Sequence, residues 1–237
     1  MYGPFIFYHK IDLPPPDAKI RGGYTPPKRF AKQMAFLKKQ GFVFYTVSDM
    51  IDSYLKHGRF PSRGIAITFD DGWNDNYENA FPVLRQLNIK ATVFLISSCI
   101  GQISNKAQSV GEGPRAHLSK LEIREMQEYG IEFGSHTLSH KLLDRISPEE
   151  VKIEVEQSKK QLEDILKAPC NVFAYPGGHY DEVARRLVKD AGYRVAFTTR
   201  YGPVDHFDPF ALNRTEILRR DRFVYQFARK VRPLVQV

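Results

Sequence analysis

Short apolar runs recur along the whole chain, separated by polar or glycine-containing stretches. Runs of this length that are rich in β-branched and aromatic residues are typical of β-strands. The runs are FIFY (5–8), FVFY (42–45), IAITF (65–69), ATVFLI (91–96), IEFG (131–134), NVFAY (171–175), VAFTT (195–199) and NRTEI (213–217). The pattern therefore predicts seven or eight short strands.

Helical patterns with recognisable ends lie between most of these runs. Ser119 and Glu122 have the spacing of a capping box, Ser147 is followed by Pro148 and Glu150, and Asp181 begins a further helix. The predicted helices span residues 27–40, 76–88, 119–130, 147–167 and 181–191. Because Pro82 falls inside the second of them, that helix should begin late or kink there.

Strands that alternate with helices over most of a chain indicate a parallel sheet. Their number favours a distorted, closed or nearly closed (β/α) barrel over an open doubly wound sheet. A length of 237 residues fits one domain over residues 1–237. Two stretches without periodicity, residues 13–27 and 101–117, are expected to be surface loops; they either shape the mouth of the barrel or merely connect elements.

The composition is that of a soluble globular protein, with 42% hydrophobic and 26% charged residues and no apolar run long enough for a membrane-spanning helix. The first residues lack the basic leader, apolar stretch and cleavage site of a secretory signal, so a cytoplasmic location is expected. The two cysteines, Cys99 and Cys170, have no metal-knuckle or redox spacing and are expected to be reduced thiols.

The net charge of +8 constrains the partners of the protein more than its fold. Basic residues are dense only near the end of the chain, at Arg219, Arg220, Arg222, Arg229, Lys230 and Arg232, interleaved with Phe223, Tyr225 and Phe227. The commoner structure for such a segment is a helix with a solvated basic face and an apolar underside. We therefore expect no nucleic-acid partner, whereas peripheral contact with an anionic membrane stays open, as does the oligomeric state.

Two adjacent carboxylates end the third apolar run, in the sequence Thr68-Phe69-Asp70-Asp71-Gly72. Neighbouring side chains at a strand end point in different directions, so one acid can bind a metal while the other acts as a base. The glycine permits a tight turn beside them. A helix N-cap or an Asx turn is the structural alternative, and it accounts for one aspartate more readily than for two.

Two histidines, His136 and His140, directly follow the fifth run. On a helical turn, imidazoles four residues apart lie on one side and can share an ion, although seven histidines in the chain make a chance pair plausible. Together with Asp71 they supply two nitrogens and one oxygen, the ligand set of catalytic zinc sites. We expect one divalent ion, zinc, for which cobalt or nickel could substitute.

The segments TFDDG and HTLSH match, residue for residue, the first two motifs of the polysaccharide deacetylase family, also called the NodB-homology or carbohydrate esterase family 4 domain. The sequence AYPGG (174–178) lies where the third motif should be, so the chain resembles this family over roughly residues 1–217. The resemblance implies a distorted (β/α) barrel and an N-acetylated sugar or glycan as substrate. It implies Asp70 as general base, Asp71, His136 and His140 as metal ligands, and the backbone N–H of Gly177 as oxyanion donor.

The sequence departs from the usual pattern of the family. An arginine that orients the base normally belongs to the third motif, but Ala174 occupies its position, and Gly177 replaces an aromatic residue. The only tryptophan, Trp73, lies beside the acids and not in a fourth motif, and the histidine of the fifth motif is missing after Ile217. The residues expected to contact substrate are Trp73, Tyr175, Pro176 and His179.

These departures suit the subgroup that resembles poly-β-1,6-N-acetylglucosamine deacetylases, whose first strand ends in a pair like Tyr8-His9 and whose barrel looks circularly permuted. His9 is predicted to be the general acid, because barrel closure would bring it to the same rim as Asp70 and His136. His179 is the competing acid. Alternatively, His9 only holds the first strand in place.

The parts predict a hydrolysis. The ion polarises the acetamide carbonyl and activates a bound water, Asp70 removes a proton from that water, and the oxyanion rests on the ion and the Gly177 N–H. Two alternatives stay open: a small-amide hydrolase of the allantoinase-like type, and a catalytically weak sugar-binding relative. A sugar-binding protein has no need of a base beside three metal ligands, which argues against the latter.

Overall fold

A curled parallel β-sheet occupies the centre of the molecule in the computed structural model, which describes residues 3–16, 18–104, 113–203 and 207–234. The strand order is β10-β1-β3-β4-β7-β8-β9, and β2 pairs with β3 beside this path. Its strands are β1 (Phe5–Tyr8), β2 (Val43–Tyr45), β3 (Gly64–Phe69), β4 (Thr92–Leu95), β7 (Glu132–Ser135), β8 (Val172–Ala174), β9 (Val195–Phe197) and β10 (Thr215–Glu216). All eight predicted runs are therefore strands.

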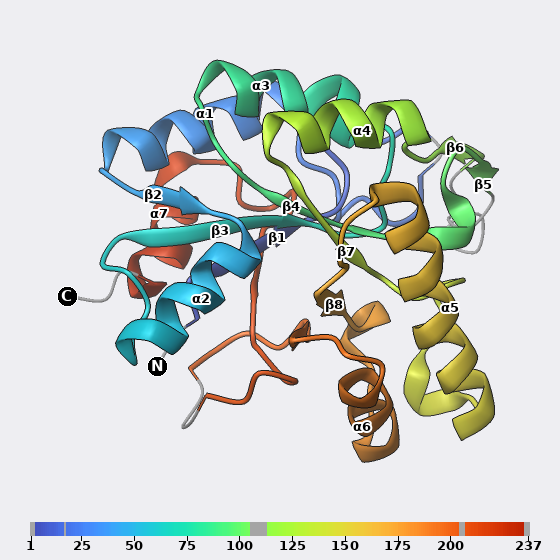
Figure 1. The fold of residues 1–237 in the computed structure, drawn as a ribbon. Helices are drawn as coiled ribbons and strands as arrows, with labels where there is room; N and C mark the ends of the chain where they lie inside the picture. Colours follow the sequence, from blue (N-terminus) through green and yellow to red (C-terminus); the bar gives the residue numbers. More distant parts are fainter. Residues whose placement is uncertain (1–2, 17, 105–112, 204–206, 235–237) are drawn as a thin grey trace.

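Helices surround the sheet, with α1, α3 and α4 along one side and α5 and α6 next to β7 and β8 (Figure 1). They are α1 (Pro27–Lys39), α2 (Val47–His57), α3 (Phe81–Gln86), α4 (Lys120–Tyr129), α5 (Pro148–Leu166), α6 (Glu182–Asp190) and α7 (Val224–Val231). Ser119 and Ser147 form the expected capping boxes, and Asp181 caps α6. The sequence reading did not predict α2, although the Thr46 side chain accepts a bond from the Asp49 N–H at its start.

The sheet curls back on itself through the segment that leads into β10. Phe197 of β9 pairs with Leu212, whose N–H donates to the Ala196 carbonyl at 3.0 Å. A few residues later β10 pairs with β1, with Ile6 opposite Thr215. The segment from β9 to β10 thus connects β9 with β1, the two sides of the sheet. This closure confirms the predicted NodB-like (β/α) barrel.

The register of β1 on β3 sets the height of the barrel rim. Both strands are fully buried, and the pairing of Phe5 with Ala66 continues to that of Tyr8 with Phe69. Because parallel strands in this register end at the same level, the residues that follow them, His9 and Asp70, emerge at one edge. This edge carries the candidate site.

Two local features differ from the predicted pattern. The helix predicted over 76–88 is broken, because a π-helical turn, Asn76–Ala80, precedes α3, and Pro82 lies in the first turn of α3. The stretch 101–117 contains a short antiparallel pair, β5 (Ile103–Ser104) with β6 (Arg115–Ala116), whereas residues 105–112 lie outside the described part.

The end of the chain forms the predicted helix with an apolar underside. Phe227 and Val231 of α7 are buried, while its Arg229 and the neighbouring Arg222 and Arg232 are exposed. Cys99 and Cys170 are buried free thiols, as expected. None of the helices within the described ranges combines the length and apolar character needed to cross a membrane.

Candidate active site

The two aspartates after β3 diverge, as the sequence predicted. Asp71 has a left-handed backbone with φ of 74°, and Gly72 follows with φ of 69°. A Cβ on Gly72 would lie 2.5 Å from Leu95 Cδ2, so the turn requires glycine for both space and conformation. The turn sends the Asp71 side chain toward two histidines and leaves Asp70 directed at the barrel interior.

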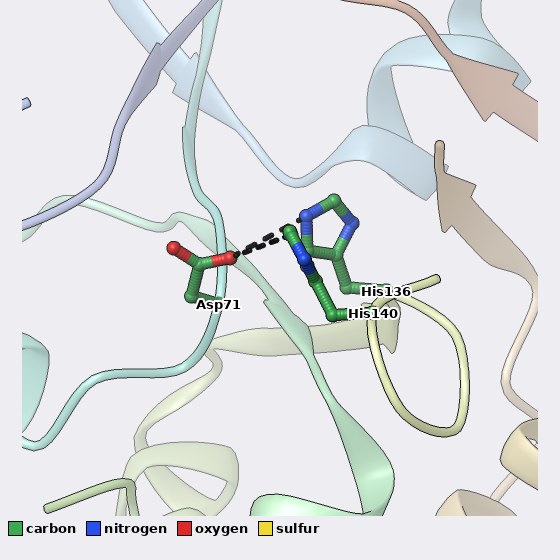
Figure 2. A group of neighbouring side chains, drawn as sticks. All are labelled: Asp71, His136 and His140. Carbon is green, nitrogen blue, oxygen red and sulfur yellow. Dashed lines mark ion pairs between the residues drawn. The ribbon is translucent and has the colours of Figure 1, made fainter. Parts of the chain in front are cut away.

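Asp71, His136 and His140 form a compact group of possible metal ligands (Figure 2). Asp71 Oδ1 lies 3.5 Å from His136 Nε2 and 3.3 Å from His140 Nε2, and the ligand atoms of all three lie within 4.8 Å of one another. His136 Nδ1 is 2.7 Å from the Ala174 carbonyl oxygen, to which it donates as an N–H. That bond leaves the Nε2 lone pair directed at the shared space.

The segment that carries the histidines is a loop, so the predicted helical turn is wrong. Thr137 and His140 both have positive φ, 68° and 65°, which no helix contains. The His140 N–H donates to Thr137 Oγ1 at 2.9 Å and closes the loop. The two imidazole rings still converge, with centroids 4.9 Å apart, because the left-handed residues turn the chain back on itself.

The protonation states of this group suit metal binding. Burial lowers the pKa of His136 to about 4, so its imidazole is neutral near pH 7. Burial alone would raise the pKa of the Asp71 carboxyl, but the hydrogen bond and charge of His140, with the charges of His9 and His136, hold it well below its usual range. A neutral imidazole and a carboxylate are the forms that bind divalent ions.

Trp73 lies under the Asp71 carboxylate and is not open to a substrate. The indole is 3% exposed, and its Nε1–H donates to Asp71 Oδ2 at 2.9 Å. Its ring stacks on His117 at 4.2 Å between centroids, and the Lys10 ammonium lies 5.0 Å from the ring. His117 Nδ1 is also 3.1 Å from the Asp71 backbone oxygen. Trp73 and His117 therefore hold the side chain and the backbone of one predicted metal ligand.

Replacing Trp73 by phenylalanine should weaken metal binding about 10- to 100-fold, the usual cost of losing a hydrogen bond to a metal ligand. Phenylalanine keeps an aromatic ring against His117 but cannot donate to Asp71. The measurement is the dissociation constant for zinc or cobalt by competition with a chelator. Tyr77→Phe is the control, because it removes the hydrogen bond that the Tyr77 hydroxyl donates to Glu125, away from the metal ligands. Unchanged affinity in Trp73→Phe would contradict the positioning role.

The Asp70 carboxylate is paired with Arg214, which the sequence reading did not identify. Arg214 Nη1 donates to Asp70 Oδ1 and Nη2 to Oδ2, both at 2.7 Å, and both side chains are buried. The guanidinium also donates to Thr68 Oγ1 and to the Thr198 carbonyl, and its plane lies 4.3 Å from the Phe7 ring centroid. Arg214 therefore holds both carboxylate oxygens of Asp70 in fixed positions.

Arg214, in the segment just before β10, thus takes the place of the base-orienting arginine that is missing at Ala174. Burial raises the pKa of Asp70, but the Arg214 charge, assisted by His136, outweighs it and lowers the pKa, so the group is a carboxylate at neutral pH. One signal in the sequence could have found Arg214. A charged residue inside the run NRTEI must be paired if that run is a buried strand.

His9 immediately follows β1 and lies beside Asp70 and Asp71. Its Nδ1 lies 3.7 Å from Glu216 Oε1 of β10, and its charge contributes to the lowered pKa of both Asp70 and Asp71. Gly23 lies next to it, because a Cβ there would be 3.7 Å from His9 Cβ. The structure thus brings His9 to the same rim as the acids, and its role as general acid stays a prediction.

The third motif forms a tight turn after β8. Tyr175 and Pro176 are buried, and the Tyr175 hydroxyl donates to the Phe210 carbonyl, so these two residues support the turn from beneath. Gly177 is exposed with φ of 60°, and Thr199 Oγ1 donates to its carbonyl. Gly177 is therefore the accessible residue of the motif, and its role as oxyanion donor stays a prediction.

His179 follows this turn and bonds to a neighbouring loop. Its Nδ1 lies 2.9 Å from Asp144 Oδ2, and the side chain is 38% exposed. Asp144 lies four residues after His140, so the pair joins the loop after β7 to the loop after β8. His179 is accessible, whereas the three other predicted substrate contacts, Trp73, Tyr175 and Pro176, are buried.

Comparison with known proteins agrees with this geometry. The model of the polysaccharide deacetylase family matches residues 57–196, more than half of the chain. The chain belongs to the polysaccharide deacetylase family. The matched range contains both aspartates, both histidines and the third motif of this deacetylase, whereas the segments with His9 and Arg214 lie outside it. The predicted family and enzyme class, a carbohydrate de-N-acetylase, are confirmed.

This deacetylase is similar to several characterised proteins. It is 30% identical over 189 residues to a poly-beta-1,6-N-acetyl-D-glucosamine N-deacetylase of Staphylococcus aureus, covering 76% of this chain and 62% of that protein. Its fold matches the Streptococcus pyogenes deacetylase PplD with a TM-score of 0.83 and 25% identity, over 98% of both chains. BC0361, a polysaccharide deacetylase from Bacillus cereus, matches with a TM-score of 0.80 and 28% identity, over 98% of this chain and 69% of that one.

Proposed function

We propose that this chain is a metal-dependent hydrolase that removes the N-acetyl group from an N-acetylated sugar or glycan. One observation carries the proposal. Three potential ligand atoms, from Asp71, His136 and His140, lie within 4.8 Å of one another, and the residue directly before Asp71 is a carboxylate held in place, Asp70. The name of the staphylococcal relative supports an N-acetylglucosamine polymer as the substrate class, although this chain spans only 62% of that protein.

The ligand residues favour a borderline metal. Asp71, His136 and His140 offer one oxygen and two nitrogens, a set that suits zinc, with cobalt or nickel as substitutes, better than magnesium or calcium. A bound ion of this kind supplies Lewis acidity toward the acetamide carbonyl and water. Trp73 and Ala174 satisfy the remaining polar atoms of Asp71 and His136, so the ligand atoms are preorganised.

The remaining residues transfer protons to and from the reacting groups or stabilise the negative charge that develops on the carbonyl oxygen. Asp70 accepts the proton of the attacking water, and Arg214 fixes the direction of its oxygens. The Gly177 N–H stabilises the oxyanion, a contribution of about 2.7–4 kcal/mol for one such donor in other enzymes. His9 gives a proton to the leaving amine, which otherwise could not depart.

Replacing His136 or His140 by alanine should abolish stoichiometric metal binding, because each removes one of three protein ligands. Elemental analysis of the purified variants measures the metal-to-protein ratio, which should be about one in the wild type. His57→Ala, at the end of α2, is the control and should retain the metal. Full occupancy in both ligand variants, at unchanged thermal stability, would refute the assignment.

The reaction itself is tested by its products. The metal-loaded protein should release acetate from N-acetylglucosamine oligomers, and removal of the metal by a chelator should stop that release. Release of ammonia or a ureide from small cyclic or linear amides, without acetate from sugars, would support the allantoinase-like alternative. Saturable oligomer binding without any product would indicate the sugar-binding alternative.

A further inference from the structure

The N-terminal turn of α7 exposes three adjacent apolar side chains. Phe223 is 58% exposed, Val224 41% and Tyr225 67%. The rings of Phe223 and Tyr225 stack at 5.5 Å with an angle of 9° between their planes. The opposite face of the helix is fully packed, since Phe227 and Val231 are buried. These exposed side chains therefore do not belong to the core that holds the helix in place.

Arginines surround this apolar group. The exposed basic residues of this segment and its exposed apolar group are together called the aromatic–arginine surface: Arg220, Arg222, Phe223, Val224, Tyr225, Arg229 and Arg232. The one acid within the segment, Asp221, is buried and paired with Lys230 at 2.7 Å. The side chains that this segment presents to its surroundings are therefore cationic or apolar.

A groove of about 790 Å³ adjoins this surface, between α1 and α7. Its lining has the same character, with aromatic rings and guanidinium groups: Phe36, Phe42, Tyr225, Arg63, Arg229 and Arg232. An occupant of this region must offer negative charge to the arginines and apolar contact to the rings.

A short segment connects this surface to the barrel rim. The chain runs from Glu216, the partner of His9, to Phe223 in seven residues, which span at most about 25 Å when extended. The Arg219 N–H on this path donates to the Gly22 carbonyl at 2.8 Å, and Gly23 lies against His9. The Phe223 end of the surface is therefore joined to the rim by a short segment, whereas the groove, lined by Phe42 and Arg63 just before β2 and β3, lies at the opposite end of the strands.

We propose that the aromatic–arginine surface docks the protein on an anionic membrane. Aromatic side chains with one polar edge are favoured at the membrane interface, and arginines nearby are attracted to anionic headgroups. A nucleic acid would satisfy the arginines, but it offers little to the exposed aliphatic Val224 or to the apolar wall of the groove.

Flotation with lipid vesicles tests the proposal on the whole chain. The wild type should bind vesicles that contain phosphatidylglycerol and not vesicles of phosphatidylcholine alone, and high salt should weaken the binding. Each arginine near an anionic surface strengthens binding about fivefold, so Arg220→Gln/Arg222→Gln should weaken it roughly 30-fold. Phe223→Ser/Tyr225→Ser should weaken it about tenfold or more.

Matched substitutions on α4, Leu121→Ser and Arg124→Gln, change an exposed apolar and an exposed basic residue elsewhere and should have no effect. The surface variants should still release acetate from a soluble oligomer, so a failure of the membrane proposal is distinct from a failure of the proposed function. Absence of vesicle binding, equal binding by the surface variants, or an oligonucleotide affinity that depends on the arginines alone would each overturn the membrane assignment. So would a dimer that Tyr225→Ser dissociates.

Discussion

Asp70→Asn should lower turnover about 10²- to 10⁴-fold while leaving the metal in place, because this range is typical for the loss of a general base. The metal should remain, since both Asp70 oxygens bond to Arg214 and the ligand atoms belong to Asp71 and the two histidines. Turnover and metal content are measured on the same preparation. Loss of metal together with activity would mean that Asp70 is a ligand and that the roles of the two aspartates are reversed.

Asp70→Asn should also lower the free energy of unfolding, because it removes the charged partner of the buried Arg214. Breaking one side of a buried ion pair typically costs about 3–5 kcal/mol, because the remaining charge has no partner. Activity must therefore be compared well below the melting temperature of the variant. Arg214→Lys is the companion variant: it keeps a charge beside Asp70 but cannot form the two parallel hydrogen bonds, so its activity should be reduced while its metal content stays unchanged.

His9→Ala should lose most of the rate and the alkaline limb of the pH profile of kcat/KM, which reports the essential acid of the free enzyme. His9 lies next to both aspartates but outside the group of metal ligands, so metal content and melting temperature should be retained. The measurement is kcat/KM for a soluble N-acetylglucosamine oligomer across the pH range.

His179→Ala is the matched comparison, because His179 is the other accessible histidine next to a catalytic motif. Its bond to Asp144 points to a role in holding two loops together, so its loss should change KM more than the pH profile. If His9→Ala remains within a few-fold of the wild type, or if the limb vanishes only in His179→Ala, the acid comes from the third-motif loop.

The rim of the barrel could be predicted because strand ends are a local property of the sequence. Most of the apolar runs stop at a polar or glycine residue, and in a parallel barrel such stops fall at one edge. His9 and Asp70 are therefore brought to one level by the pairing of Tyr8 with Phe69, without any special local conformation.

Other parts depend on information that a periodic pattern does not contain. The loop of His136 and His140 needs left-handed backbone at His140 and at Thr137, a β-branched residue that rarely adopts positive φ. The partner of Asp70 lies 144 residues away, and only closure of the ring brings Arg214 to it. Trp73 was expected to face the substrate because aromatic residues often do, but its N–H is directed at Asp71.

The segment that closes the barrel has a consequence for the synthesis of the protein. Glu216 lies in β10 and Arg214 is the residue just before that strand, so the chain made up to residue 200 contains every predicted metal ligand but neither the partner of the base nor that of His9. A nascent chain of that length has the predicted ligand residues but lacks the arginine that orients the base. Hydrolytic competence therefore arises late in translation, together with closure of the ring.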